Sequence, residues 1–254
     1  MSASAGNKIR SWMTGAIRIR RQGRQPARGK AARWLIRIAV FLVGLAMIPL
    51  VLTLVYAIPS VHPISTPMLK DIILSRPYKR EWVSLDQISP NLIRSVIMSE
   101  DGQFCRHNGI DWRQMRMVVD DTLAGEETRG ASTIPMQAVK NLFLWGGRSY
   151  LRKALEAPLA LYFDAVLSKR RILEIYLNIV RWGPGIFGAQ AAAEYHFRRP
   201  ASALGRRQGA LLAVTLPNPY LRHPERPSAG LRRLATLIER RTARYASSHV
   251  TCLD

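Results

Sequence analysis

The sequence is poor in cysteine and in acidic residues. Its 254 residues include two cysteines, Cys105 and Cys252, and 17 acidic side chains against 38 lysines and arginines. Two distant cysteines form neither a Cys-x-x-Cys pair nor a disulfide framework, so we expect two unpaired thiols, with a single bridge between them as the alternative. The shortage of acids gives a formal net charge of +21 at pH 7. Such a charge predicts an anionic partner: nucleic acid, anionic lipid or a phosphorylated substrate.

Acidic residues are missing altogether from the first 34 residues, which are rich in arginine. An apolar run without any charge extends from Ile38 to Ile58, and about 20 such residues cross a membrane as a helix. We therefore expect a basic cytoplasmic tail over 1–34 and a single transmembrane anchor over 35–58, with the rest of the chain on the periplasmic side of an inner membrane. A cleaved signal peptide is the alternative, but no clear Ala-x-Ala site follows the run. This topology excludes nucleic acid and favours membrane lipids or a pyrophosphate-linked substrate.

Strand patterns are also lacking, and the remaining signals predict a mainly α class. A proline-rich linker is expected over 59–80, a folded domain over 81–246 and a C-terminal tail over 247–254. Ser89 caps the first predicted helix of the domain, with Pro90 in its first turn. Ser168 is expected to cap a later one.

Two adjacent acids end this first helix. Glu100 continues the apolar face of Ile93, Val96 and Ile97, at a helix C-terminus where the macrodipole disfavours an anion. Both effects raise a carboxylate pKa, as a general base requires. Asp101 points elsewhere and is expected to hold the following loop. A solvent-facing acid is the ordinary alternative, and a metal site of Asp101, Cys105 and His107 matches no standard ligand spacing.

Several motifs in order resemble the peptidoglycan glycosyltransferases of glycosyltransferase family 51, from about Trp82 to Leu216 and more weakly to Arg233. No transpeptidase domain follows these motifs, and in this respect the chain resembles the monofunctional members of the family. The first motif is met by Glu100, Asp101, Phe104, His107 and Gly109. The second is met in part by Gly130, Ser132, Thr133, Ile134, Gln137, Lys140 and Asn141. The third is met by Arg152, Lys153, Glu156, Ser168, Lys169, Ile172, Leu173, Glu174, Tyr176, Leu177 and Asn178.

The resemblance implies a lysozyme-like helical domain with a membrane-associated flap, and polymerisation of lipid II with inversion and release of a lipid pyrophosphate. Glu100 is then the general base and Glu156 the second essential acid. Lys140, Arg148, Arg152 and Lys153 are candidates for the pyrophosphate, with Arg148, Arg152 and Glu156 expected on one helical face. The other motif residues are candidates for substrate binding: Asp101, Phe104, His107, Ser132, Thr133, Gln137, Asn141, Glu174, Tyr176 and Asn178. For Glu174, Tyr176 and Asn178 a structural role is equally expected.

The same resemblance implies no tightly bound cofactor, with Mg or Mn as a divalent activator. Its partners would be lipid II, the growing glycan strand, membrane lipids and other cell-wall synthesis and division proteins. The second motif departs from the family at Pro135 and Met136, where a hydroxyl residue and a glutamine are usual, so we expect altered substrate contacts. Two alternatives are a glycan-cleaving enzyme on a lysozyme-like scaffold and a non-catalytic membrane-anchored scaffold with a degenerate site.

Overall fold

The structure is a computed structural model that describes residues 28–125, 130–147 and 149–253. The chain divides into two units, Met1–Leu45 and Ala46–Asp254. Helix α1 (Arg28–Tyr56) contains Pro49. Its stretch Ala31–Tyr56 is, within the described residues, the one helix long and apolar enough to cross a membrane. The predicted apolar span is therefore one continuous helix.

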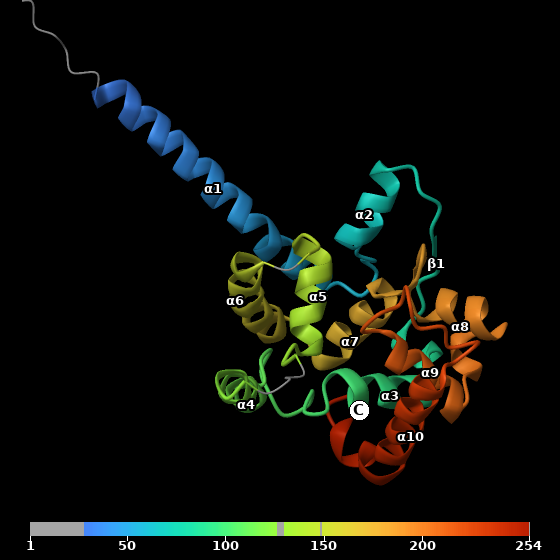
Figure 1. The fold of residues 1–254 in the computed structure, drawn as a ribbon. Helices are drawn as coiled ribbons and strands as arrows, with labels where there is room; N and C mark the ends of the chain where they lie inside the picture. Colours follow the sequence, from blue (N-terminus) through green and yellow to red (C-terminus); the bar gives the residue numbers. More distant parts are fainter. Residues whose placement is uncertain (1–27, 126–129, 148, 254) are drawn as a thin grey trace, which may run out of the picture. The chain divides into compact units, whose positions relative to one another are not determined.

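The second unit is built mainly from helices, so the predicted mainly α class is confirmed (Figure 1). The α-helices are α2 (Thr66–Ile73), α3 (Pro90–Glu100), α4 (Trp112–Leu123), α5 (Ile134–Phe143), α6 (Tyr150–Val166), α7 (Lys169–Ile179), α8 (Ala189–Phe197), α9 (Arg206–Thr215) and α10 (Ala229–His249). Two short 3₁₀ turns, η1 (Leu85–Gln87) and η2 (Ala201–Ala203), complete the helical elements described.

A small sheet interrupts this helical pattern. It consists of β1 (Lys79–Arg80), β2 (Arg181–Gly183) and β3 (Ile186–Phe187), in the order β1-β3-β2. β1 pairs parallel with β3, and β2 pairs antiparallel with it. The sequence predicted no strand, and this was wrong, because strands of two or three residues are too short to show an alternating pattern.

The expected linker over 59–80 contains helix α2. Ser65 caps it by accepting a hydrogen bond from the Met68 amide at 3.4 Å. Met68 is fully buried, and the buried Asp71 accepts a hydrogen bond from Arg181 at 2.9 Å. The prolines that suggested a linker include Pro67 in the first turn of α2, where a missing amide proton costs nothing.

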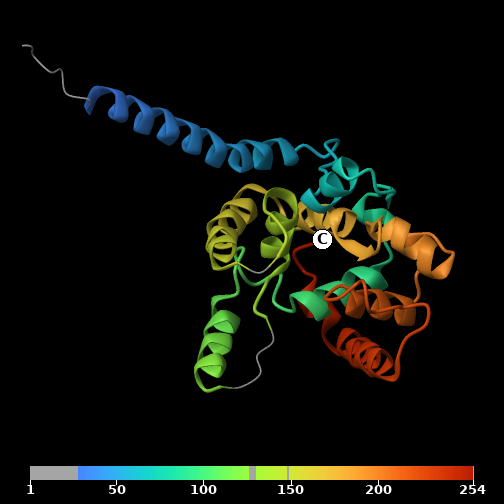
Figure 2. The same cartoon turned by 45° about the horizontal axis from the view of Figure 1, so that its top comes forward.

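Two groups of helices carry the rest of the unit. α3 packs against α9 and α10, while α5 packs against α6 and α7, as the two views show (Figure 2). Gly209 allows the close approach of α9 to α3, because a Cβ there would lie 2.9 Å from the backbone of Asn91. Helix α4 buries none of its residues.

A disulfide joins Cys105, in the loop after α3, to Cys252 near the end of the chain. The expectation of unpaired thiols was wrong. A separation of 147 residues gives no local signal, and only the fold brings the two cysteines together. Stable disulfides are typical of oxidising compartments.

Candidate active site

Glu100 is the last residue of α3 and lies at the end of its buried face. Ser89 accepts a hydrogen bond from the Asn91 amide and Pro90 begins the helix, as predicted. Val96 and Ile97 are fully buried, so the same face carries Glu100 to the edge of the core, where it is partly buried.

The Glu100 side chain lines two adjoining hollows. The first, of about 540 Å³, is a cleft that lies between the end of α3, helix α5, the loop after α9 and helix α10. The second, of about 810 Å³, extends over the loop after α3 and helix α4. Residues that line both are Ser99, Glu100, Gly130 and Arg241. Glu100 is therefore placed where two bound groups could meet.

Burial raises the pKa of the Glu100 carboxyl above its ordinary value. Hydrogen bonds from Gln137 (3.1 Å) and Ser99 (3.3 Å) oppose that shift, as do the positive charges of Arg222 and Lys140. The net direction agrees with the sequence argument, with burial as the main cause. A carboxylate in this position is both solvent-reachable and basic enough to accept a proton.

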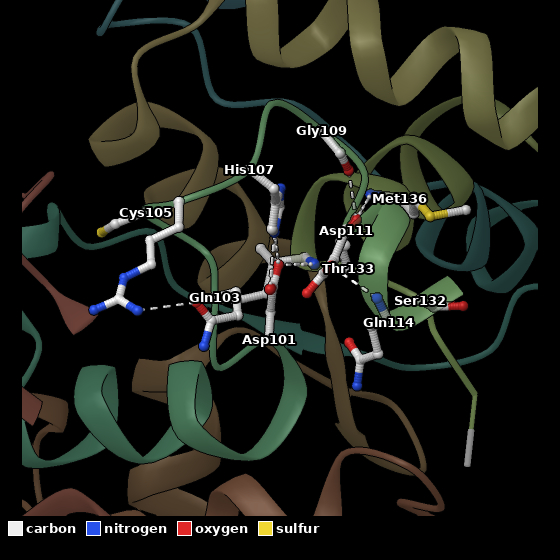
Figure 3. A network of polar contacts seen from close by, with 12 residues as sticks. Asp101, Gln103, Cys105, His107, Gly109, Asp111, Gln114, Ser132, Thr133 and Met136 are labelled. Atoms are coloured by element: carbon white, nitrogen blue, oxygen red, sulfur yellow. Dashed lines mark hydrogen bonds and ion pairs between the residues drawn. The ribbon is translucent and has the colours of Figure 1, made fainter. Parts of the chain in front are cut away.

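Asp101 holds the loop after α3 against the start of α5. Its buried carboxylate accepts hydrogen bonds from His107 Nε2 at 2.9 Å and from the Ile134 amide at 2.9 Å. The Thr133 hydroxyl, which caps α5, donates to the Gly109 carbonyl at 2.6 Å. Figure 3 shows His107, Asp101 and Thr133 converging on this junction. These contacts fix the position of Glu100 relative to α5.

A cluster of cations lies next to the cleft. On α6, Arg152 and Lys153 both donate to the buried Glu156, Lys153 at 3.0 Å. Lys153 also donates to the Ser132 hydroxyl at 2.9 Å, and Ser132 lines the cleft. Burial is the first cause that lowers the pKa of Lys140, and the charge of Arg152 lowers it further. Burial likewise lowers the pKa of Lys153, followed by the charges of Lys140 and Arg152.

The positive charges of Lys140, Arg152 and Lys153 lie close enough to repel one another. The Glu156 carboxylate neutralises only part of this positive charge. Such a group is stabilised by a further anion, and phosphate oxygens suit it. The cluster is therefore a candidate anion-binding site next to the cleft.

The predicted helical face of Arg148, Arg152 and Glu156 is described only from the start of α6. Ser149 caps α6, and Arg152 and Glu156 both lie on this helix. Arg148 itself lies outside the described residues.

The transglycosylase family model matches residues 67–242. The chain belongs to the transglycosylase family. Three curated relatives are each called biosynthetic peptidoglycan transglycosylase. The protein from Mesorhizobium japonicum is 60% identical over 223 residues, covering 87% of this chain and 94% of the relative. That from Rhizobium etli is 58% identical over 217 residues (85% and 93%), and that from Brucella suis 56% identical over 223 residues (87% and 99%). The chain is therefore an enzyme, a transglycosylase, and the family predicted from its motifs is confirmed.

Some of the motif residues of this transglycosylase lie behind the cleft. Phe104 is fully buried, with Lys169 Nζ 4.9 Å from its ring centroid. Tyr176 is fully buried and donates to Gln137 Oε1 at 3.0 Å, which orients the amide that reaches Glu100. The backbone carbonyl of Asn141 accepts a hydrogen bond from Thr66 at 3.1 Å. In this structure their contacts are with the protein itself.

Glu174 and Asn178 likewise serve the scaffold of the transglycosylase. Glu174 accepts a hydrogen bond from the Leu85 amide at 3.1 Å and pairs with Arg171. The fully buried Asn178 side chain bonds both the amide and the carbonyl of Val83, at 3.0 and 2.9 Å. These bonds tie α7 to the segment that precedes α3, as the structural interpretation expected.

Two cleft residues escaped the sequence analysis. Arg222, in the proline-rich loop after α9, lines the cleft and donates to the Val214 carbonyl. Arg241 of α10 lines both hollows. Neither belongs to a motif, and they lie 122 and 141 positions after Glu100 in the sequence, so no local pattern could reveal them.

Pro135 and Met136, the departures from the family pattern, do not face the cleft. Pro135 is buried in the first turn of α5, where it deprives the helix of no hydrogen bond. Met136 is 1% exposed and belongs to the core. Met136, next to Gln137 on α5, points about 100° away from it, and the expected change in substrate contacts stays a prediction.

The acids of the site do not form a ready-made metal centre. The described residues contain no group of three or more His, Cys, Asp or Glu that could hold a metal ion. Both oxygens of Glu156 accept hydrogen bonds from cations, Arg152 on one and Lys153 on the other. This donor set does not fit a resident divalent cation.

Proposed function

We propose that this transglycosylase polymerises peptidoglycan glycan strands from lipid II. The observation that carries the proposal is the placement of Glu100, a carboxylate of raised pKa, between two hollows and beside a cation cluster. An inverting transfer needs these parts: a base for the acceptor, a place for the donor and cations for the leaving group.

Glu100 is the proposed general base. It takes the proton of the 4-hydroxyl of the acceptor sugar as that oxygen attacks the anomeric carbon of the donor. A new β-1,4 glycosidic bond forms while the bond to the pyrophosphate oxygen breaks, and the proton stays on Glu100 until solvent removes it. The hydrogen bond from Gln137 at 3.1 Å orients the carboxylate for this step.

Lys140, Arg152 and Lys153 are proposed to bind the departing lipid pyrophosphate. The pKa of each lysine is lowered partly by neighbouring cations, so the negative charge that develops on the leaving group relieves their repulsion. Glu156 holds Arg152 and Lys153 in position. We also propose that Glu156 takes part in the reaction directly. A single donor directed at a developing anion contributes about 10²–10³ in kcat.

The cation cluster also favours a polymerase over a glycan-cleaving enzyme. Cleavage needs an acid at the glycosidic oxygen and has no anionic leaving group. Divalent activation, if it operates through Mg²⁺ or Mn²⁺, would use phosphate oxygens of the substrate, since magnesium sites commonly combine substrate phosphates with few carboxylates.

The membrane arrangement is proposed as well. Helix α1 is apolar enough to span, and by the positive-inside rule the arginine-rich tail before it favours a cytoplasmic N-terminus. The Cys105–Cys252 disulfide independently favours an oxidising, periplasmic location for the second unit. Lipid II in the membrane would then lie within reach of the site, and partners from cell-wall synthesis and division remain a prediction.

Purified full-length protein with labelled lipid II in detergent tests the proposal. Polymer on a gel is expected from the wild type, and Glu100→Gln should abolish it. Glu81→Gln, an exposed acid outside the hollows, is the matched control and should retain activity. Well-folded wild-type protein that makes no polymer would favour the scaffold alternative, and cleavage of preformed strands would favour the hydrolase.

A further inference from the structure

Helix α10 carries a strongly one-sided charge. It contains five arginines and a single acid, Glu239. Glu239 pairs with Arg207 of α9 at 2.9 Å and lines a separate hollow with Arg94 and Arg206. The acid therefore does not neutralise the opposite face of the helix.

Two hollows run along that face and continue from the cleft. The cleft, the next hollow of about 760 Å³ and the outer one of about 500 Å³ share Leu237 as a lining residue. Arg241 lines the cleft and the next hollow, while Arg240 lines that hollow and the outer one. Arg232 and Arg233 also line the outer hollow. We call Arg232, Arg233, Arg240 and Arg241 the arginine track.

The arginine track is exposed and its positive charge is not balanced locally. No acidic residue lines either of the two outer hollows. Within the described part of the chain, no carboxylate lies within ion-pair distance of Arg233 or Arg240. Arg232 donates to the Pro227 carbonyl at 2.6 Å, which fixes it at the end of the track. A row of this kind suits an extended polyanion.

The arginine track continues from the cleft, and this indicates which polyanion it binds. A separate lipid headgroup would account for the charge but not for its course, because the hollows that the arginines line continue from the cleft. A polymer held at Glu100 must leave the cleft, and the hollows along α10 continue from it. Peptidoglycan strands carry peptides with free carboxylates, and guanidinium groups bind these in bidentate fashion.

We propose that the arginine track binds the growing glycan strand outside the cleft, through the carboxylates of its peptides. This proposal rests on the proposed polymerase function. It adds a second binding surface that retains the strand between additions, so loss of the track shortens the products without preventing the transfer itself.

The test uses full-length protein in detergent and soluble, uncrosslinked glycan strands that carry their peptides. Arg233→Gln combined with Arg240→Gln should weaken strand binding about fivefold, since each exposed ion pair contributes modestly. The matched control combines Arg199→Gln with Arg226→Gln, which removes the same charge from exposed positions outside the track, and should change binding little. Equal melting temperatures for the two variants confirm that both fold.

Strands whose carboxylates have been amidated provide the second arm. They should bind wild type and track variant equally weakly. Equal losses of strand binding in the two double variants would overturn the proposal. So would amidated strands that bind the wild type as tightly as unmodified strands do, or a track variant that loses binding to anionic vesicles but not to strands. With labelled lipid II, the track variant should make shorter products than the control variant, and products of equal length would count against it. If the wild type binds strands normally but makes no polymer, the polymerase function is rejected and the strand-binding role of the arginine track is retained.

Discussion

Gln137 joins the proposed base to the core of the protein. Its Nε2 donates to the Glu100 carboxylate at 3.1 Å, and its Oε1 accepts from the Tyr176 hydroxyl at 3.0 Å. Because Tyr176 is fully buried, the Gln137 amide has one favoured orientation, with its NH₂ group toward Glu100. The position and pKa of Glu100 therefore depend on Gln137 and, through it, on a buried tyrosine.

Replacement of Gln137 by leucine should shift the pH dependence of the reaction. The Gln137 hydrogen bond lowers the pKa of Glu100, opposing burial, so its loss raises that pKa further. A base must be ionised, and activity falls as pH decreases through its pKa, so the acidic limb of kcat/KM should move to higher pH. A hydrogen bond to a charged group contributes about 1.5–3 kcal/mol, so we expect the limb to move upward by about one to two pH units.

Tyr176→Phe is the control for that experiment, because it removes the bond to Gln137 and leaves Gln137 beside Glu100. It should cost about 1 kcal/mol of stability and move the acidic limb much less. An acidic limb unchanged in Gln137→Leu would contradict Glu100 as the titrating base.

Lys140 should determine the alkaline side of the profile. Burial and the charge of Arg152 lower its pKa below 10.5, so it loses its proton, and its hold on the pyrophosphate, as pH rises through this lowered value. Lys140→Arg keeps the charge to higher pH, so the basic limb of kcat should move upward. Lys140→Met should reduce kcat about 10²–10³-fold at all pH values.

Lys70→Met is a suitable control for Lys140→Met, since Lys70 is exposed on α2 away from the cleft. A basic limb that stays in place in Lys140→Arg would assign that limb to another group.

The sequence predicts the elements of this fold where the signals are local. Ser89 and Ser168 cap α3 and α7 as expected, because a hydroxyl before an apolar helical pattern is a short-range signal. The family motifs likewise point to Glu100, Gln137, Lys140 and Lys153 from the order of residues alone. Arg222, Arg241 and the Cys105–Cys252 bond depend on segments far apart in the chain, so tertiary contacts alone bring them to the site.

The same limit explains the wrong assignments. Helix α2 was mistaken for a linker because its proline occupies a first turn, and α4, none of whose residues is buried, was not predicted. Phe104 and Asn178 are a different case, because their contacts in the structure are with the protein itself and a structural role for Asn178 was equally expected. A sequence motif does not distinguish residues that position the site from residues that contact the substrate.

Removal of the disulfide should destabilise the second unit. It links positions 147 residues apart, and cross-links of this kind typically contribute about 2–4 kcal/mol. Cys105→Ser with Cys252→Ser should lower the melting temperature, and a reducing agent should lower that of the wild type by a similar amount. Reductant should have no effect on the double variant. A wild type insensitive to reductant under conditions that reduce the bond would contradict a stabilising role.

Substitutions at the neighbouring residues Met136 and Pro135 should have different effects on stability. Met136→Gln, which restores the usual family residue, places an amide in a site that is 1% exposed and should cost about 1–3 kcal/mol of stability. Pro135→Ser should be nearly neutral, because the first turn of α5 does not use an amide at that position. Neither change should increase kcat/KM, since neither side chain lines the cleft. Thermal melts and lipid II kinetics measure both effects, and a Met136→Gln variant that is as stable as wild type and more active would mean that this position faces the substrate.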